Sequence, residues 1–127
     1  MSDAHQTLRG SCHCGAVVFE ITGPPIDKGI RCNCSICRRR NAVMSPMYYK
    51  PGFFTLLQGE VSLKRYHFGD KVVDHAFCAS CGIYTFHSTV GDPSSGVRVN
   101  LCCIEDIDIY TLPTRLFDGR ETWTWLD

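Results

Sequence analysis

The chain has 127 residues, of which 44% are hydrophobic and 20% are charged. These values are typical of one globular domain over residues 1–127, long enough to bury roughly two-thirds of its unfolded surface. The formal net charge is zero, so the composition gives no sign of a nucleic-acid partner. No apolar run approaches the roughly 18 residues needed to cross a bilayer, and we expect no membrane partner.

Residues 1–10 are polar and lack the apolar core of a signal peptide. We therefore expect a cytoplasmic protein in a reducing compartment. In such a compartment, cysteine pairs are more often metal ligands or redox groups than disulfides. The odd total of nine cysteines also argues against a fully paired disulfide framework.

Short strands dominate the secondary structure that the sequence predicts. Alternating or β-branched segments indicate strands at residues 16–21, 43–50, 61–66, 72–77, 83–87 and 97–101. Helix is expected only as one turn capped by Ser35 and another turn within residues 52–57. Residues 91–96 have the composition of a surface loop. The predicted fold class is mainly β, with antiparallel sheets pinned by metal where cysteines meet.

Seven of the nine cysteines fall into three short knuckles, which are Cys12/Cys14, Cys32/Cys34/Cys37 and Cys78/Cys81. Four thiolates close a tetrahedral zinc site, whereas three leave one position open. Seven cysteines therefore match one closed site and one open site. We infer zinc from the type of ligand, although tetrahedral four-cysteine sites also hold iron.

The first and third knuckles are expected to form the closed site together. Both border predicted strands, so a shared ion would clip two distant parts of the chain and add its binding energy to folding. Gly15 and Gly82 follow these knuckles directly. Each glycine can supply the positive φ that such a turn often needs.

The spacing of the middle knuckle is compatible with three interpretations of its role. Cys32, Cys34 and Cys37 can cover three corners of a tetrahedron around an open catalytic metal. Alternatively, Cys102, Cys103 or a histidine closes a second structural site. The Cys34-x-x-Cys37 spacing also matches a redox pair, although no βαβ pattern surrounds it.

Several other side chains are candidates for the site. Arg38, Arg39 and Arg40 follow the middle knuckle and could bind carboxylates of a small substrate. His75 and His87 flank the third knuckle and are interpreted first as structural histidines. Cys103 is interpreted as a buried apolar residue. Trp123 and Trp125 could add an edge strand or pack on a partner chain, which allows a homodimer.

The ordered motifs resemble the glutathione-dependent formaldehyde-activating enzyme family, which also contains centromere protein V. The resemblance extends over a core of about residues 9–118 and is carried by Gly10-Ser11-Cys12-His13-Cys14-Gly15, Cys32-Asn33-Cys34-Ser35-Ile36-Cys37-Arg38 and Phe77-Cys78-x-x-Cys81-Gly82. The segment Asn33-Cys34-Ser35-Ile36-Cys37 is closer to the centromere protein V branch. Many enzyme-branch members have His where Asn33 stands.

The resemblance implies a β-tent fold with two zinc ions per chain. It assigns the structural zinc to Cys12, Cys14, Cys78 and Cys81, and the catalytic zinc to Cys32, Cys34 and Cys37. It implies a carbon–sulfur lyase of the S-hydroxymethylglutathione synthase type, which joins glutathione or another small thiol to a small aldehyde such as formaldehyde. The alternatives are a non-catalytic zinc module that binds a protein or nucleic acid, and a thiol redox sensor.

Overall fold

A computed structural model describes residues 5–67 and 73–126. Its elements, in chain order, are β1 (Gln6–Ser11), β2 (Val18–Gly23), β3 (Gly29–Cys32), α1 (Ser35–Arg40), β4 (Phe54–Gln58), η1 (Glu60–Ser62), β5 (Leu63–Tyr66), β6 (Val73–Cys78), β7 (Tyr84–Thr89), η2 (Pro93–Ser95), β8 (Val97–Val99), η3 (Leu101–Cys103) and β9 (Thr114–Phe117). The predicted mainly β class is confirmed. No helix in the described ranges is long and apolar enough to cross a membrane.

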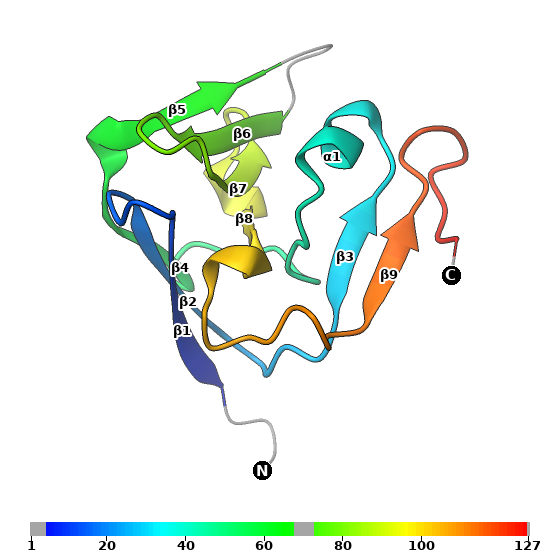
Figure 1. The fold of residues 1–127 in the computed structure, drawn as a ribbon, viewed down its shortest axis with the longest axis horizontal. Helices are drawn as coiled ribbons and strands as arrows, with labels where there is room; N and C mark the ends of the chain where they lie inside the picture. Colours follow the sequence, from blue (N-terminus) through cyan, green and yellow to red (C-terminus); the bar gives the residue numbers. More distant parts are fainter. Residues whose placement is uncertain (1–4, 68–72, 127) are drawn as a thin grey trace.

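The strands form three small sheets (Figure 1). Strands β1, β2 and β4 make one antiparallel sheet, and β5, β6, β7 and β8 make a second. Strands β3 and β9 form a separate pair, which lies with α1 on the side of the molecule opposite β1. This pair is parallel, with Cys32 opposite Phe117. The prediction of antiparallel sheets thus holds for the two larger sheets.

A cluster of aromatic rings joins the two larger sheets. The rings of Phe19 and Phe54 lie 5.8 Å apart, and Phe54 contacts Phe86 of the second sheet at 4.9 Å. Phe19 is fully buried. Gly10 on β1 allows its ring to lie close, since a Cβ at that position would come within 2.5 Å of the Phe19 Cζ atom. This contact explains why the sheet needs a residue without a side chain there.

Several local predictions differ from the structure. Residues 43–50 do not form a continuous strand but make isolated bridges at Met44 and Tyr49, because Pro46 and the turn around it interrupt pairing. The helical turn expected within residues 52–57 is wrong, since Phe54–Gln58 pairs with β2. Helix α1 exists, but Cys34 occupies the N-cap position and no side chain caps the helix. The first residue of the strand expected at 72–77 lies outside the described residues.

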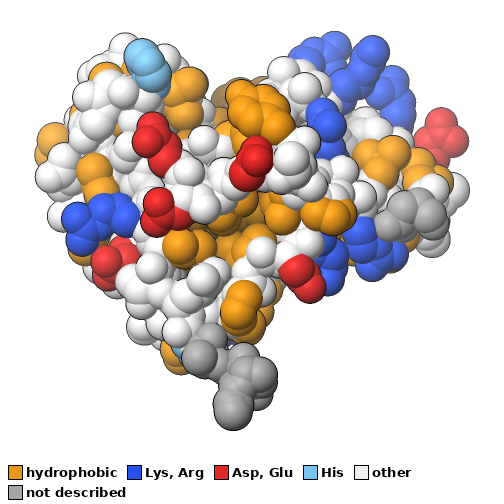
Figure 2. Space-filling view, turned by 60° about the horizontal axis from the view of Figure 1, so that its bottom comes forward, with side chains coloured by type: hydrophobic (Ala, Val, Ile, Leu, Met, Phe, Trp, Pro, Cys, Tyr) orange, Lys and Arg blue, Asp and Glu red, His pale blue; other side chains and the backbone are white. Residues whose placement is uncertain are grey.

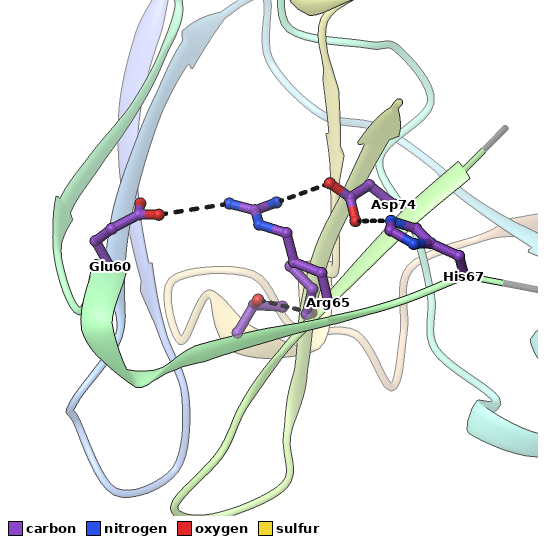
Figure 3. Close-up of polar contacts among 6 residues, drawn as sticks. Glu60, Arg65, His67 and Asp74 are labelled. Carbon is purple, nitrogen blue, oxygen red and sulfur yellow. Dashed lines mark hydrogen bonds and ion pairs between the residues drawn. The ribbon is translucent and has the colours of Figure 1, made fainter. Parts of the chain in front are cut away.

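A surface network of ion pairs links η1 and the antiparallel strands β5 and β6 (Figure 3). Arg65 lies 3.9 Å from Glu60 and 3.5 Å from Asp74, and the His67 Nε2 atom lies 2.7 Å from the Asp74 carboxylate. His67 is exposed, as the sequence predicted. Surface ion pairs of this kind contribute about 1 kcal/mol or less, so this network supports the hairpin without defining the fold.

The buried Phe19 ring generates a first prediction. The Phe19→Ala variant should lose about 3–5 kcal/mol of unfolding free energy, because the substitution leaves a large cavity between the two sheets. Urea unfolding in zinc-containing buffer measures this loss. Val61 is 97% exposed, so Val61→Ala is the matched control and should change stability by about 0.5 kcal/mol or less. Equal stability of both variants would contradict the packing described above.

Candidate metal centres and pocket

Cys12, Cys14, Cys78 and Cys81 come together as the sequence predicted. Their sulfur atoms all lie within 4.8 Å of one another. Cys12 follows β1 and Cys78 ends β6, so this group joins the two larger sheets. Cys12 and Cys78 are buried and form a small second core with Val17.

The backbone at these knuckles directs hydrogen bonds at the sulfur atoms. The amide of Val17 donates to the Cys12 Sγ atom at 3.3 Å, and the amide of Ser80 donates to the Cys78 Sγ atom at 3.4 Å. Such bonds favour the thiolate, which is the form that binds metal. The positive φ predicted for the two glycines is confirmed, at 84° for Gly15 and 80° for Gly82.

The sulfur separations fit a tetrahedral metal. Cys12 and Cys14 sulfur atoms lie 3.7 Å apart, as do those of Cys14 and Cys78. A tetrahedron with metal–sulfur bonds of about 2.3 Å has edges of about 3.8 Å. A disulfide would instead require about 2.05 Å. The donor set and its spacing therefore fit zinc, and these residues could hold it.

Cys32, Cys34 and Cys37 form a second group at the junction of β3 and α1. Their sulfur atoms also lie within 4.8 Å of one another, and no fourth Cys, His, Asp or Glu joins them in the part of the chain that the structure describes. Cys102 is exposed on η3, whereas the Cys103 thiol is buried and lies 3.6 Å from the Tyr84 carbonyl oxygen. Neither cysteine closes the group, which favours an open metal position.

The three arginines of α1 point to different surroundings. Arg40 donates from Nη2 to the Cys37 Sγ atom at 3.3 Å and stacks 4.0 Å above the Tyr84 ring. Arg39 bonds the Ser35 carbonyl oxygen of its own helix, and Arg38 is exposed. Of the predicted carboxylate ligands, only Arg40 lines the cavity beside the open group, and its guanidinium already contacts a cysteine.

Two buried histidines line the same cavity. Burial, followed by the charge of Arg40, lowers the pKa of His75 to about 4. Burial, followed by the charges of Arg40 and Arg98, lowers the pKa of His87 to about 3. The Nδ1 atom of His75 lies 2.9 Å from the Arg40 Nη1 atom. Both rings are therefore neutral near pH 7 and serve as polar walls beside a cationic group.

The chain after β9 folds back over the open cysteine group, and we call residues 118–125 the C-terminal strap. The Asn33 side-chain amide makes two hydrogen bonds to it: Nδ2 donates to the Asp118 carboxylate at 3.0 Å, and Oδ1 accepts from the Arg120 backbone amide at 3.1 Å. Hydrogen bonds from the Thr122 side chain and then Asn33 lower the pKa of Asp118 to about 2. A Cβ on Gly119 would lie 2.6 Å from the Cys32 Sγ atom. The strap thus lies directly against the cluster.

A cavity of about 810 Å³ opens beside Cys32, Cys34 and Cys37. Aromatic residues of its wall include Tyr48, Phe117, Trp123 and Trp125, while Arg40, Arg98 and Arg120 are its cationic residues. Trp125 lies 5.1 Å from Phe117, so this tryptophan packs on its own chain. Figure 2 shows that most Lys and Arg side chains of one face gather at the end of the molecule where β3, β9 and α1 lie.

Sequence reasoning did not identify several of these wall residues. Arg98 and Arg120 belong to no local motif. Pairing of β8 with β7 places Arg98, and the pairing of β3 with β9 together with the Asn33 bonds places Arg120. The alternating pattern at residues 97–101 was a usable signal for β8, but it did not reveal which partner Arg98 would face.

Comparison with known proteins relates the chain to a protein family, to a named protein and to a solved structure. A family model described as "Glutathione-dependent formaldehyde-activating enzyme" matches residues 7–123. A Halomonas elongata protein named "Putative glutathione-dependent formaldehyde-activating enzyme" is 56% identical over 32 residues, which span 25% of this chain and 20% of that protein. A crystal structure of a Rhodobacter sphaeroides protein is similar with a TM-score of 0.68 and 32% identity, covering 84% of this chain and 99% of that one.

The Asn33 contacts generate a second prediction. Asn33→Ala should destabilise the protein by about 1–3 kcal/mol, since it leaves the Asp118 carboxylate and the Arg120 amide without this partner. Hydrogen exchange should rise at residues 118–122, whereas exposed Thr55→Ala should leave it unchanged. Asn33→Asp should loosen the strap further by placing two carboxylates together. Unchanged exchange in both Asn33 variants would show that the strap does not depend on this residue.

The low pKa of His87 generates a third prediction. The unfolded chain takes up a proton near the ordinary value of 6.5, whereas folded His87 does so only near 3. Unfolding is therefore favoured as the pH falls from 6.5 toward 3. When the pH is lowered from about 7 to 5, the unfolding free energy of the wild type should fall by roughly 1–2 kcal/mol more than that of His87→Gln. Metal loss in acid affects both proteins, so the difference isolates His87, and equal losses would refute its role.

Proposed function

The chain belongs to the glutathione-dependent formaldehyde-activating enzyme family, and from this premise we propose that it is a zinc-dependent enzyme of the carbon–sulfur lyase type. It joins glutathione, or a similar small thiol, to a small aldehyde such as formaldehyde. The observation that carries the proposal is the group of three thiols beside a cavity of about 810 Å³. A cavity of this size accepts a tripeptide-sized ligand.

We assign different roles to the two cysteine groups. Cys12, Cys14, Cys78 and Cys81 hold a structural zinc that joins the two larger sheets. Cys32, Cys34 and Cys37 would hold a catalytic zinc, because three thiolate ligands are one fewer than a closed structural site uses. When bound there, zinc would supply a Lewis acid that favours the thiolate form of the substrate thiol.

The surrounding cations make this position suitable for a further thiolate. Three cysteine thiolates with one Zn²⁺ carry a net charge of about −1, and a fourth thiolate would bring it to about −2. The Arg40 guanidinium, bonded to the Cys37 sulfur, offsets this charge. Aromatic side chains in the wall lower the polarity around the site, which strengthens these electrostatic interactions.

The reaction itself is a simple addition. The thiolate sulfur forms a bond to the aldehyde carbon, the carbonyl bond becomes a single bond, and the oxygen takes up a proton. No oxidant or reductant is needed. The chain's residues contribute by binding the thiol, offsetting its charge and positioning it in the cavity.

A second candidate is a zinc module that binds nucleic acid or protein without catalysis. It is favoured only by the exposed side chains of Arg38 and Arg39 on α1. A gel shift that disappears with salt and in Arg38→Ala/Arg39→Ala would support it. The cytoplasmic location and a homodimer remain predictions of the sequence.

The proposed chemistry generates a fourth prediction, tested with metal content and rate together. Wild-type protein should contain about two zinc ions per chain by elemental mass spectrometry, and Cys37→Ser about one. The rate of S-hydroxymethylglutathione formation is measured by NMR exchange, and the spontaneous rate is subtracted. This enzymatic rate should be about a hundredfold lower in Cys37→Ser than in the wild type. Exposed Cys102→Ser is the matched control. Full activity of Cys37→Ser with one zinc would overturn the proposal.

A further inference from the structure

Arg98 is a half-buried cation at the wall of the cavity. It lies at the centre of β8, and its Nη2 atom donates to the Pro46 carbonyl oxygen at 3.2 Å. Its guanidinium lies 4.5 Å from the centroid of the Tyr48 ring. These two contacts fix the plane of the guanidinium. Its Nε atom is buried and has no hydrogen-bond partner among the described residues.

The cavity offers Arg98 no acidic partner. The described residues that line it include no Asp or Glu, and none of the ion pairs among the described residues involves Arg98. The Arg40 Nε atom likewise lacks a partner among the described residues, but both terminal nitrogens of Arg40 already contact His75 and Cys37. Arg98 bonds through only one terminal nitrogen and therefore retains more hydrogen-bonding capacity than Arg40.

A partly buried charge without an acidic partner is costly. Burial lowers the pKa of Arg98, although the charges of Tyr48 and then Cys37 and Cys32 act in the opposite direction. Proteins rarely bury a guanidinium unless an anion pairs with it. A ligand that brings a carboxylate would relieve this cost and gain a charge-assisted, planar hydrogen-bonded contact.

We propose that Arg98 binds a carboxylate of the thiol substrate and so makes the cavity selective for thiols that carry one. This inference rests on the proposed function, because it places the thiol of the same molecule at Cys32, Cys34 and Cys37. Glutathione has two free carboxylates and a thiol between them, so one molecule can occupy both places. The sequence suggested that arginines of α1 bind the carboxylate, whereas this proposal assigns that contact to Arg98 of β8.

The test uses protein with cobalt in place of zinc, because a thiolate that binds cobalt adds a charge-transfer absorption band. Glutathione, glutathione diethyl ester and cysteamine are titrated into wild type, Arg98→Met and Arg98→Lys. Arg98→Met should weaken glutathione binding about 10- to 100-fold, the scale of a charge-assisted hydrogen bond. It should change binding of the ester and of cysteamine about twofold or less. Arg98→Lys keeps the charge but loses the planar fork, so we expect an intermediate loss.

Arg9→Met is the control, because Arg9 is exposed on β1 and pairs with Glu20 at 3.4 Å. It should leave all three titrations unchanged. Equal weakening of glutathione and cysteamine in Arg98→Met would overturn the inference and assign Arg98 a purely structural role. Equal affinity of wild type for glutathione and its diethyl ester would also overturn it, and this arm needs no variant.

The same experiment separates the two proposals. If none of the thiols, including cysteamine, changes the cobalt spectrum of the wild type, the proposed function fails and the inference fails with it. If all thiols bind but Arg98→Met retains full affinity for glutathione, the inference alone fails. A melting curve of each variant confirms that the protein compared is folded.

Discussion

The convergence of four sulfur atoms at the junction of β1 and β6 is the interaction on which the rest of the structure depends. The two larger sheets are small and share one cluster of aromatic rings around Phe19. A second contact, through Cys12 and Cys78, lies at another point along the same sheets. The sulfur spacing of 3.7 Å fits a tetrahedral metal. A metal at this point would fix the sheets more rigidly than a few apolar side chains can.

With these sheets in place, the parallel pairing of β3 and β9 forms the second cysteine group's surroundings. Cys32 stands opposite Phe117, so the chain leaves β9 directly beside the open cluster. The Asn33 amide then holds the strap through Asp118 and Arg120. Gly119 is required at the point of closest approach, because a side chain would meet the Cys32 sulfur. One wall of the cavity thus depends on a contact between residues 85 positions apart.

Charged groups are unevenly distributed, although their sum over the whole chain is zero. The formal net charge is zero, yet the cavity combines three thiols with Arg40, Arg98 and Arg120 and has no acidic lining residue among those described. The neutral His75 and His87 add polar surface without further charge. This separation is the basis for the proposed binding of an anionic sulfur and a carboxylate together, which a uniformly mixed surface would not favour.

Features that depend on short-range spacing could be predicted from the chain alone. Cysteines two or three residues apart can share one metal because a single turn brings them together, so the knuckles and the turns at Gly15 and Gly82 were predictable. Alternating polar and apolar side chains predicted β5 and β8, because a half-buried strand places successive side chains on opposite faces. The family followed from the order of these motifs.

Which distant segments meet depends on long-range contacts that no local pattern reveals. Strands β1, β3 and β9 were not predicted, since β3 and β9 are short and gain their order from each other. The helical turn expected near Phe54 was wrong because pairing with β2 outweighs local preference. Arg98 and Asp118 likewise carry no local signal. Their roles arise from strand register and chain reversal, which depend on contacts across the whole domain.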